Sequence, residues 1–146
     1  IAELTDQSEL AAESPATVSS ESLFTALRRL VEGQTDRFTF RVSQTEHIQV
    51  PSLQVDVITQ ATLQAVDNAL RHSKGSQFEL AMSSNGQRLK ITVVDDGQGF
   101  WRSSVRSQSL GISHVITHGM ESIGGSGKVQ SQQEHRGTQV ILEWPR

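Results

Sequence analysis

Apolar residues recur at intervals of three or four positions in three parts of the chain, and this spacing predicts three helices. The first covers residues 20–33 and is expected to end at Gly33, the second covers about residues 53–72, and the third about residues 112–123. The expected core positions are Leu23, Phe24, Leu27, Leu30 and Val31 in the first helix, and Val55, Ile58, Thr59, Thr62, Leu63, Val66, Ala69 and Leu70 in the second.

Apolar and polar residues alternate strictly in other segments, and this alternation predicts strands. The expected strands cover residues 37–42, 47–50, 77–82, 89–94, 127–132 and 138–144. Phe38, Phe40 and Val42 would share one face of the first of them. Asn85-Gly86 and Arg136-Gly137 stand between neighbouring strands, which predicts two hairpins.

The order of these elements indicates the fold class. A helix, two strands, a long helix, a hairpin, a loop, a helix and a second hairpin fit an α+β fold. We expect a two-layer α/β sandwich in which about three helices cover one face of a mixed sheet of about five strands. Residues 1–18 are polar and contain Pro15, so we interpret them as a linker or the end of a preceding helix, with the domain at residues 19–146.

Composition narrows the possible classes of function. The chain has 146 residues, 35% of them hydrophobic, with a formal net charge of -3 and no run of Lys or Arg, so nucleic acid and anionic membranes are poor partners. No cysteine is present, which excludes thiol chemistry and a cysteine-based zinc site. No apolar run reaches the roughly 20 residues of a membrane span. The chain begins at Ile1, so we expect a fragment of a longer protein.

Four polar residues near the end of the long helix suggest a ligand site. Gln64 and Asn68 are four residues apart and share a helix face, which Arg71 and His72 extend by one turn. We expect this face to be distinct from the main core stripe. An amide oxygen suits Mg²⁺, which usually arrives with phosphates, and a guanidinium suits the phosphates themselves.

The stretch VVDDGQGF, residues 93–100, leads from a strand into carboxylates and glycines. Asp95 would accept hydrogen bonds from an amine such as that of adenine, while Gly97 and Gly99 would let the backbone approach a flat ring. Gly111 is expected to open the third helix, whose first amides could meet a phosphate, and Thr138 could add a hydroxyl to the same pocket.

Each feature alone also fits an ordinary structural role. Asn68 is consistent with a surface or helix-local hydrogen bond, and Asp95-Asp96-Gly97 with a simple turn. His114 and His118 are four residues apart and could bind a metal, but no third ligand accompanies them, and ordinary exposed or hydrogen-bonded histidines explain them better.

Four segments together resemble a known family, the ATP-binding catalytic domain of bacterial sensor histidine kinases. QAVDNALRHSKGS resembles its N box, VVDDGQGF its G1 box, SLGISHV its G2 box and GTQVILEWP its final strand. This family belongs to the gyrase, chaperone and histidine-kinase ATPases with the Bergerat fold, and the N and G1 boxes are most similar to the nitrate-sensor subclass.

The resemblance implies a role for each candidate residue. Gln64 and Asn68 would serve catalysis, with Asn68 coordinating Mg²⁺, and Asp95 would bind the adenine amine of ATP. Residues 101–109 would form a short ATP lid anchored by Gly111. The remaining implied contacts are Arg71 and His72 near the phosphates, and Gly97, Gly99 and Thr138 beside the base.

Two positions depart from the family pattern. Gln64 stands where the subclass commonly has a glutamate, and an amide cannot act as a general base, although it can position a water or a magnesium ligand. Ser109 stands where a glycine commonly precedes the Leu-Gly pair of the G2 box, and its side chain either crowds the phosphates or has no effect on them.

The implied function is delivery of the ATP γ-phosphate to a histidine on a separate dimerisation domain, for relay to a response regulator. None of the five histidines lies in a segment that resembles such an acceptor helix. We therefore expect the fragment to be a monomer and the cytoplasmic part of a membrane-bound bacterial sensor that is a homodimer at full length. An anti-sigma-factor-type serine kinase on the same fold and a degenerate nucleotide-binding interaction module remain open as alternatives.

Overall fold

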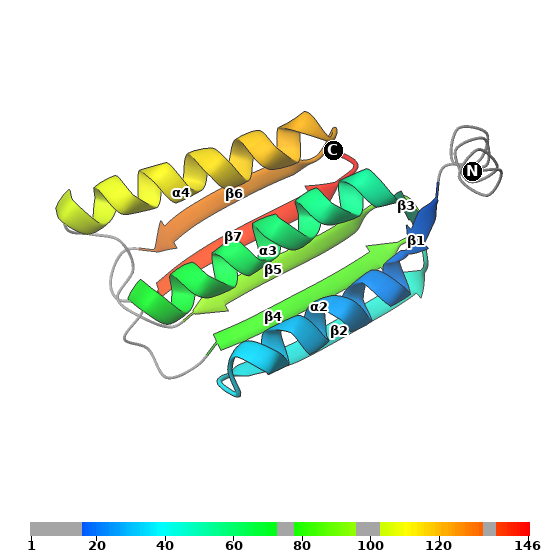
Figure 1. Ribbon diagram of the computed structural model, residues 1–146, viewed down its shortest axis with the longest axis horizontal. Coiled ribbons are helices and arrows are strands. Elements are labelled where there is room, and N and C mark those ends of the chain that lie inside the picture. Colours follow the sequence, from blue (N-terminus) through cyan, green and yellow to red (C-terminus); the bar gives the residue numbers. More distant parts are fainter. Residues whose placement is uncertain (1–15, 73–77, 96–102, 133–136) are drawn as a thin grey trace, which may run out of the picture.

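The computed structural model describes residues 16–72, 78–95, 103–132 and 137–146. Figure 1 shows helices lying over one face of a twisted sheet. The helices are α2 (Ser20–Gln34), α3 (Ser52–His72) and α4 (Ser103–Ser122). The strands are β1 (Thr17–Ser19), β2 (Phe38–Glu46), β3 (Gln49–Pro51), β4 (Phe78–Asn85), β5 (Leu89–Asp95), β6 (Ser126–Gln132) and β7 (Gly137–Trp144). The expected two-layer α+β sandwich is confirmed.

The main sheet has five strands in the order β2-β4-β5-β7-β6. β2 and β4 run parallel, and the other neighbours run antiparallel, so the sheet is mixed as expected. Parallel neighbours need a long crossover, and α3 lies in the connection between β2 and β4. Both predicted hairpins are present, and Gly86 in the β4–β5 turn has φ +86°, which suits glycine.

The core lies between the helix layer and the inner face of the sheet. In Figure 1, α2 lies over β2 and β4, α3 over β5 and β7, and α4 over β6, with α3 in the middle of the layer. Alternate residues of β4 and β5 point inward and are buried, as the sequence pattern predicts. Every other residue of these strands therefore lies on the opposite face of the sheet, which the described helices leave uncovered.

Two expected core positions are wrong. Leu30 is 45% exposed, because α2 contacts the molecule through a narrower stripe that ends in Leu27 and Val31. Val42 is 44% exposed, because β2 is an edge strand and its burial fades after Phe38.

A short second sheet joins the ends of two segments that the sequence did not connect. β1 pairs antiparallel with β3, and the carbonyl of Ala16 accepts hydrogen bonds from both the amide and the hydroxyl of Ser52. Strand β1 lies at the end of the segment expected to be a linker. A three-residue strand has too little periodicity to be predicted from sequence, and only its partner defines it.

The third helix begins earlier than expected. α4 starts at Ser103, so the segment expected to be an irregular lid, residues 101–109, is helical from its third residue. No glycine or proline occurs between Ser103 and Leu110, and the arginine, glutamine and leucine side chains there favour a helix. The serines of this stretch therefore lie in a helix and not in the expected loop.

Helix α2 continues past the glycine at which it was expected to end, and this provides a first test of the fold. Ser19 caps the helix by accepting a hydrogen bond from the amide of Ser22 at 3.2 Å, and the helix continues through Gly33 to Gln34. A Cβ added at Gly33 meets no atom within 4 Å. Gly33→Ala is therefore expected to raise the free energy of unfolding by about 0.5–1 kcal/mol, because alanine favours the helix. Urea unfolding measures the change, and a lower midpoint would contradict the helical assignment of this residue.

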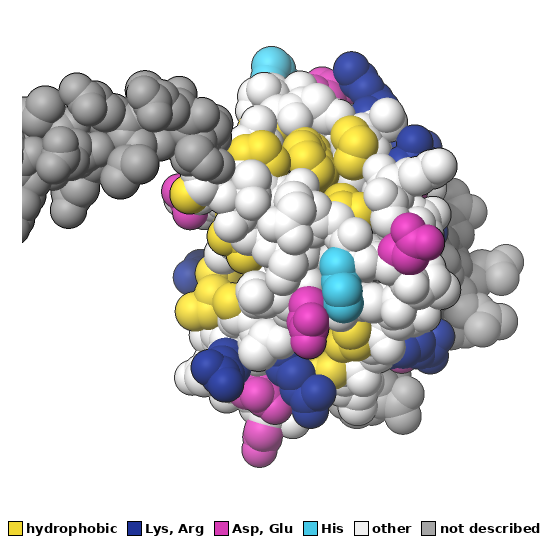
Figure 2. Space-filling model, turned by 90° about the vertical axis from the view of Figure 1, so that its right-hand side faces the viewer, with side chains coloured by type: hydrophobic (Ala, Val, Ile, Leu, Met, Phe, Trp, Pro, Cys, Tyr) yellow, Lys and Arg dark blue, Asp and Glu magenta, His cyan; other side chains and the backbone are white. Residues whose placement is uncertain are grey.

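Charged side chains of both signs are interspersed on the face shown in Figure 2, without a large patch of one sign. Among the described residues, no helix combines the length and the apolar character needed to cross a membrane.

Candidate functional site

The ends of several elements meet at one end of the sandwich, at the left of Figure 1. The C-terminal ends of α3 and β5 lie there, together with the beginnings of β7 and α4. α3 packs on both β5 and β7, so its last turns are held above the strand ends. This end gathers most of the residues that the sequence singled out.

Asp95 is the last residue of β5 and is buried, with 5% of its surface exposed. It alternates with Val93 and Ile91, which are buried under the helices, so its carboxylate points to the helix side of the sheet. An ionised carboxylate only accepts hydrogen bonds, so this position suits a ligand that donates them.

Gly137 lies directly against Asp95. A Cβ built on Gly137 would lie 2.6 Å from the carbonyl carbon of Asp95 and 2.9 Å from its Oδ1, and would collide with its carbonyl oxygen. Gly137 also has φ +86°, a conformation that other residues rarely adopt. The sequence identified this glycine as a turn residue, but its contact with Asp95 arises from strand pairing and had no sequence signal.

Thr138 lies on the same face of the sheet as Asp95. Val94 pairs with Gln139, so one further step of the antiparallel register brings Asp95 opposite Thr138. Thr138 is buried, with 6% of its surface exposed. Its hydroxyl and the Asp95 carboxylate therefore belong to neighbouring strands at the same level of the sheet.

Asn68 is buried on α3, with 4% of its surface exposed. The expectation that Asn68 avoids the core stripe is wrong, because Ala61 and Ala65 precede it along the same buried side of the helix. The side-chain oxygen Oδ1 of Asn68 is buried and has no hydrogen-bond partner among the residues that the structure describes. An unpaired buried carbonyl oxygen costs about 1–3 kcal/mol, which a cation or another donor would offset.

Gln64 and Arg71 do not join Asn68 in the interior. Gln64 is exposed, although it shares the helix with Asn68 at four-residue spacing. Arg71 is exposed and forms an ion pair with Asp67, with 3.0 Å between Nε and Oδ2. Such an exposed pair contributes little stability, so the guanidinium can exchange Asp67 for a phosphate. His72 is the last residue of α3, and its side chain lies outside the described part.

The three candidate glycines have different positions. Gly97 and Gly99 lie outside the described residues. Gly111 lies inside α4, eight residues after Ser103, so the expectation that it opens the helix is wrong. The first free amides of α4 belong to the turn that begins at Ser103.

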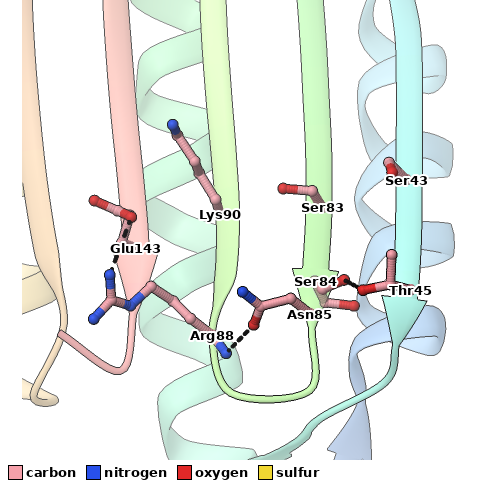
Figure 3. Close-up of a pocket in the computed structure, with 8 residues that line it drawn as sticks. All are labelled: Ser43, Thr45, Ser83, Ser84, Asn85, Arg88, Lys90 and Glu143. Atoms are coloured by element: carbon pink, nitrogen blue, oxygen red, sulfur yellow. Dashed lines mark hydrogen bonds and ion pairs between the residues drawn. The ribbon is translucent and has the colours of Figure 1, made fainter.

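A polar pocket of about 310 Å³ lies at the opposite end of the sheet, on its uncovered face (Figure 3). Ser43, Ser83, Lys90 and Glu143 follow one another across four strands through consecutive register pairs. Arg88 forms an ion pair with Glu143, with 3.7 Å between Nη1 and Oε2, and donates from Nε to the carbonyl of Pro145. The Arg88 guanidinium is therefore already engaged, and the pocket contains none of the residues expected to bind nucleotide.

Comparison with protein families gives one match over most of the chain. The model described as "Histidine kinase-, DNA gyrase B-, and HSP90-like ATPase" matches residues 54–146. The matched region contains β5, β7 and all of α3 except its first two residues, and therefore Asn68, Asp95 and Thr138.

Individual proteins agree with this match. The nitrate/nitrite sensor protein NarX of Escherichia coli K12 is 31% identical over 93 residues, which are 64% of this chain and 15% of NarX. The chain therefore spans only a small part of the length of this relative. The ATP-binding domain of PrrB from Mycobacterium tuberculosis has a TM-score of 0.63 at 16% identity, covering 88% of this chain and 95% of that one. Full-length ShkA in complex with AMPPNP has a TM-score of 0.65 at 19% identity, covering 90% and 31%.

Proposed function

Because the chain belongs to the histidine kinase-, DNA gyrase B- and HSP90-like ATPase family, we propose that it binds ATP with Mg²⁺ as the catalytic domain of a sensor histidine kinase. The observation that carries this proposal is the buried carboxylate of Asp95 beside Gly137 and Thr138. An ionised carboxylate only accepts hydrogen bonds, and the exocyclic amine of adenine donates them. Guanine has an oxygen at the corresponding position, so the same site disfavours GTP.

The rest of the site supports the phosphate half of the ligand. The orphaned Oδ1 of Asn68 is a hard oxygen of the kind that Mg²⁺ prefers, and it lies near the end of α3 that packs over β5 and β7. When bound, Mg²⁺ neutralises charge that develops on the phosphoryl group. Arg71 is within the same helical turn and supplies a guanidinium that can leave its exposed pair with Asp67.

The residues of this chain position the nucleotide and supply no nucleophile of their own. Gln64 is exposed on α3 and carries an amide, so it orients a water or the incoming group without removing its proton. The nucleophile is proposed to be a histidine of a dimerisation domain of the same protein, with a response regulator as the next acceptor. The fragment is proposed to be a monomer and the cytoplasmic part of a membrane-bound sensor that dimerises at full length, with residues 1–18 as the linker to the dimerisation domain.

Asn68→Ala tests the magnesium site. Calorimetric titration of the unmodified chain is expected to show saturable 1:1 binding of ATP in Mg²⁺ and weaker binding in EDTA. The variant is expected to bind ATP equally in both conditions, because it lacks the oxygen that holds the ion. The loss in Mg²⁺ should be about tenfold or more, which is typical when a metal site loses a supporting group.

Gln60→Ala is the matched control, because it removes an amide from an exposed position of the same helix that has no part in the proposed site. It should retain the response to Mg²⁺. A variant at Asn68 that keeps the full response would disprove the role of this residue. Failure of the unmodified chain to bind ATP would favour the degenerate interaction module instead.

A further inference from the structure

A pair of histidines on α4 stands apart from the proposed nucleotide site. His114 and His118 are one helical turn apart, and both are exposed. Their ring centroids are 4.5 Å apart, with an angle of 58° between the ring planes. Among the described residues, neither ring has a hydrogen bond or an ion pair, so their nitrogens are available to solvent.

The backbone that carries this pair is held firmly in place. Ile116 and Met120, on the opposite side of the helix, are 1% and 0% exposed. Between the histidines, the hydroxyl of Thr117 donates a hydrogen bond of 2.9 Å to the carbonyl of Gly127 on β6. The two imidazoles therefore project from a fixed turn, which lowers the entropy lost when both bind one ligand.

The spacing of the rings suits chelation. Two metal–nitrogen bonds of about 2.0–2.1 Å at a square or tetrahedral angle require the nitrogens to lie about 3 Å apart. The nitrogens lie on the ring edges, so centroids at 4.5 Å allow one nitrogen from each ring to reach this separation by rotation about the side-chain bonds.

We propose that His114 and His118 form a two-histidine binding site for a transition metal ion of the zinc, nickel or copper class, with water completing the coordination. Imidazole suits these ions, whereas Mg²⁺ prefers oxygen, so the site differs chemically from Asn68. Among the described residues, no group of three metal-binding side chains exists, and Glu121 already pairs with Arg146 at 3.9 Å. Two protein ligands make an open, exchangeable site rather than a structural one.

Binding of the metal ion to both histidines is also expected to stabilise α4. A metal that bridges two side chains of the folded helix stabilises the folded state by mass action, since the unfolded chain does not hold them together. The melting temperature of the chain should therefore rise with Zn²⁺ or Ni²⁺ concentration and stay unchanged with the same concentration of Mg²⁺. This inference does not rest on the proposed kinase function.

The test is calorimetric titration of the chain with Zn²⁺ and Ni²⁺ in a non-coordinating buffer, with melting curves at each concentration. The unmodified chain should bind one ion, and His114→Ala and His118→Ala should each weaken that binding at least about tenfold and reduce the thermal shift accordingly. Both positions are exposed, so circular dichroism should show the fold retained.

His47→Ala is the matched control. His47 is an exposed histidine on the connection between β2 and β3, where it contacts Glu21 and Gln44. This variant should bind the ion like the unmodified chain. Unchanged affinity in His118→Ala, lost binding in His47→Ala, or no saturable binding in the unmodified chain would each overturn the proposal.

Discussion

Asp95→Asn is expected to weaken ATP binding by about 10- to 100-fold. Hydrogen bonds to a charged group contribute about 1.5–3 kcal/mol, and about 1.4 kcal/mol corresponds to a factor of ten. Asn has nearly the same shape, but its amide group presents donors to the adenine amine, which is itself a donor. Calorimetric titration with ATP and Mg²⁺ measures the loss.

Asp56→Asn provides the comparison, because it removes an exposed carboxylate from α3 far from the C-terminal end of the helix, where the proposed site lies. It should bind ATP as the unmodified chain does. The unfolding midpoint of each variant must be measured as well. Asp95 is buried, so weaker ATP binding reports on the nucleotide site only if the variant remains folded. Equal ATP affinity in both variants would remove Asp95 from the nucleotide site.

Gly137→Ala is expected to lower the free energy of unfolding by about 2–5 kcal/mol. The left-handed conformation at φ +86° costs a residue with a Cβ about 1–2 kcal/mol, and overpacking adds about 1–3 kcal/mol. The overpacking arises because the new methyl group would contact the backbone of Asp95, which β5 holds in the sheet. Urea or guanidinium unfolding measures the change.

Gly124→Ala separates the two contributions. Gly124 follows α4 with φ +81°, but a Cβ there meets no atom within 4 Å, so only the conformational cost of about 1–2 kcal/mol applies. In Gly137→Ala, the added methyl group would also displace Oδ1 of Asp95. ATP binding should therefore weaken in Gly137→Ala and stay unchanged in Gly124→Ala. Equal destabilisation by the two substitutions would show that the backbone of Asp95 can move away from the added methyl group without a loss of stability.

The candidate site was only partly predictable. The residue types and their order singled out Asn68 and Asp95 as candidates, because amides and carboxylates suit particular ligands wherever they lie. The burial of Asn68 was not predictable, because Ala61 and Ala65 read equally well as surface or core alanines on a helix. The start of α4 was not predicted, because serine has no strong preference for or against a helix. The neighbouring residues therefore decide whether the helix extends through the serines.

The sequence by itself determined the type of nearly every element and the one-sided sandwich that they form. Periods of two and 3.6 residues are local properties, and they specify which face of each element is apolar without knowledge of its partners. The strand order, the parallel pairing of β2 with β4 and the closeness of Gly137 to Asp95 were decided only by the tertiary structure. These depend on contacts between residues far apart in the chain, and outside the two hairpins no local pattern encodes which strand will become a neighbour.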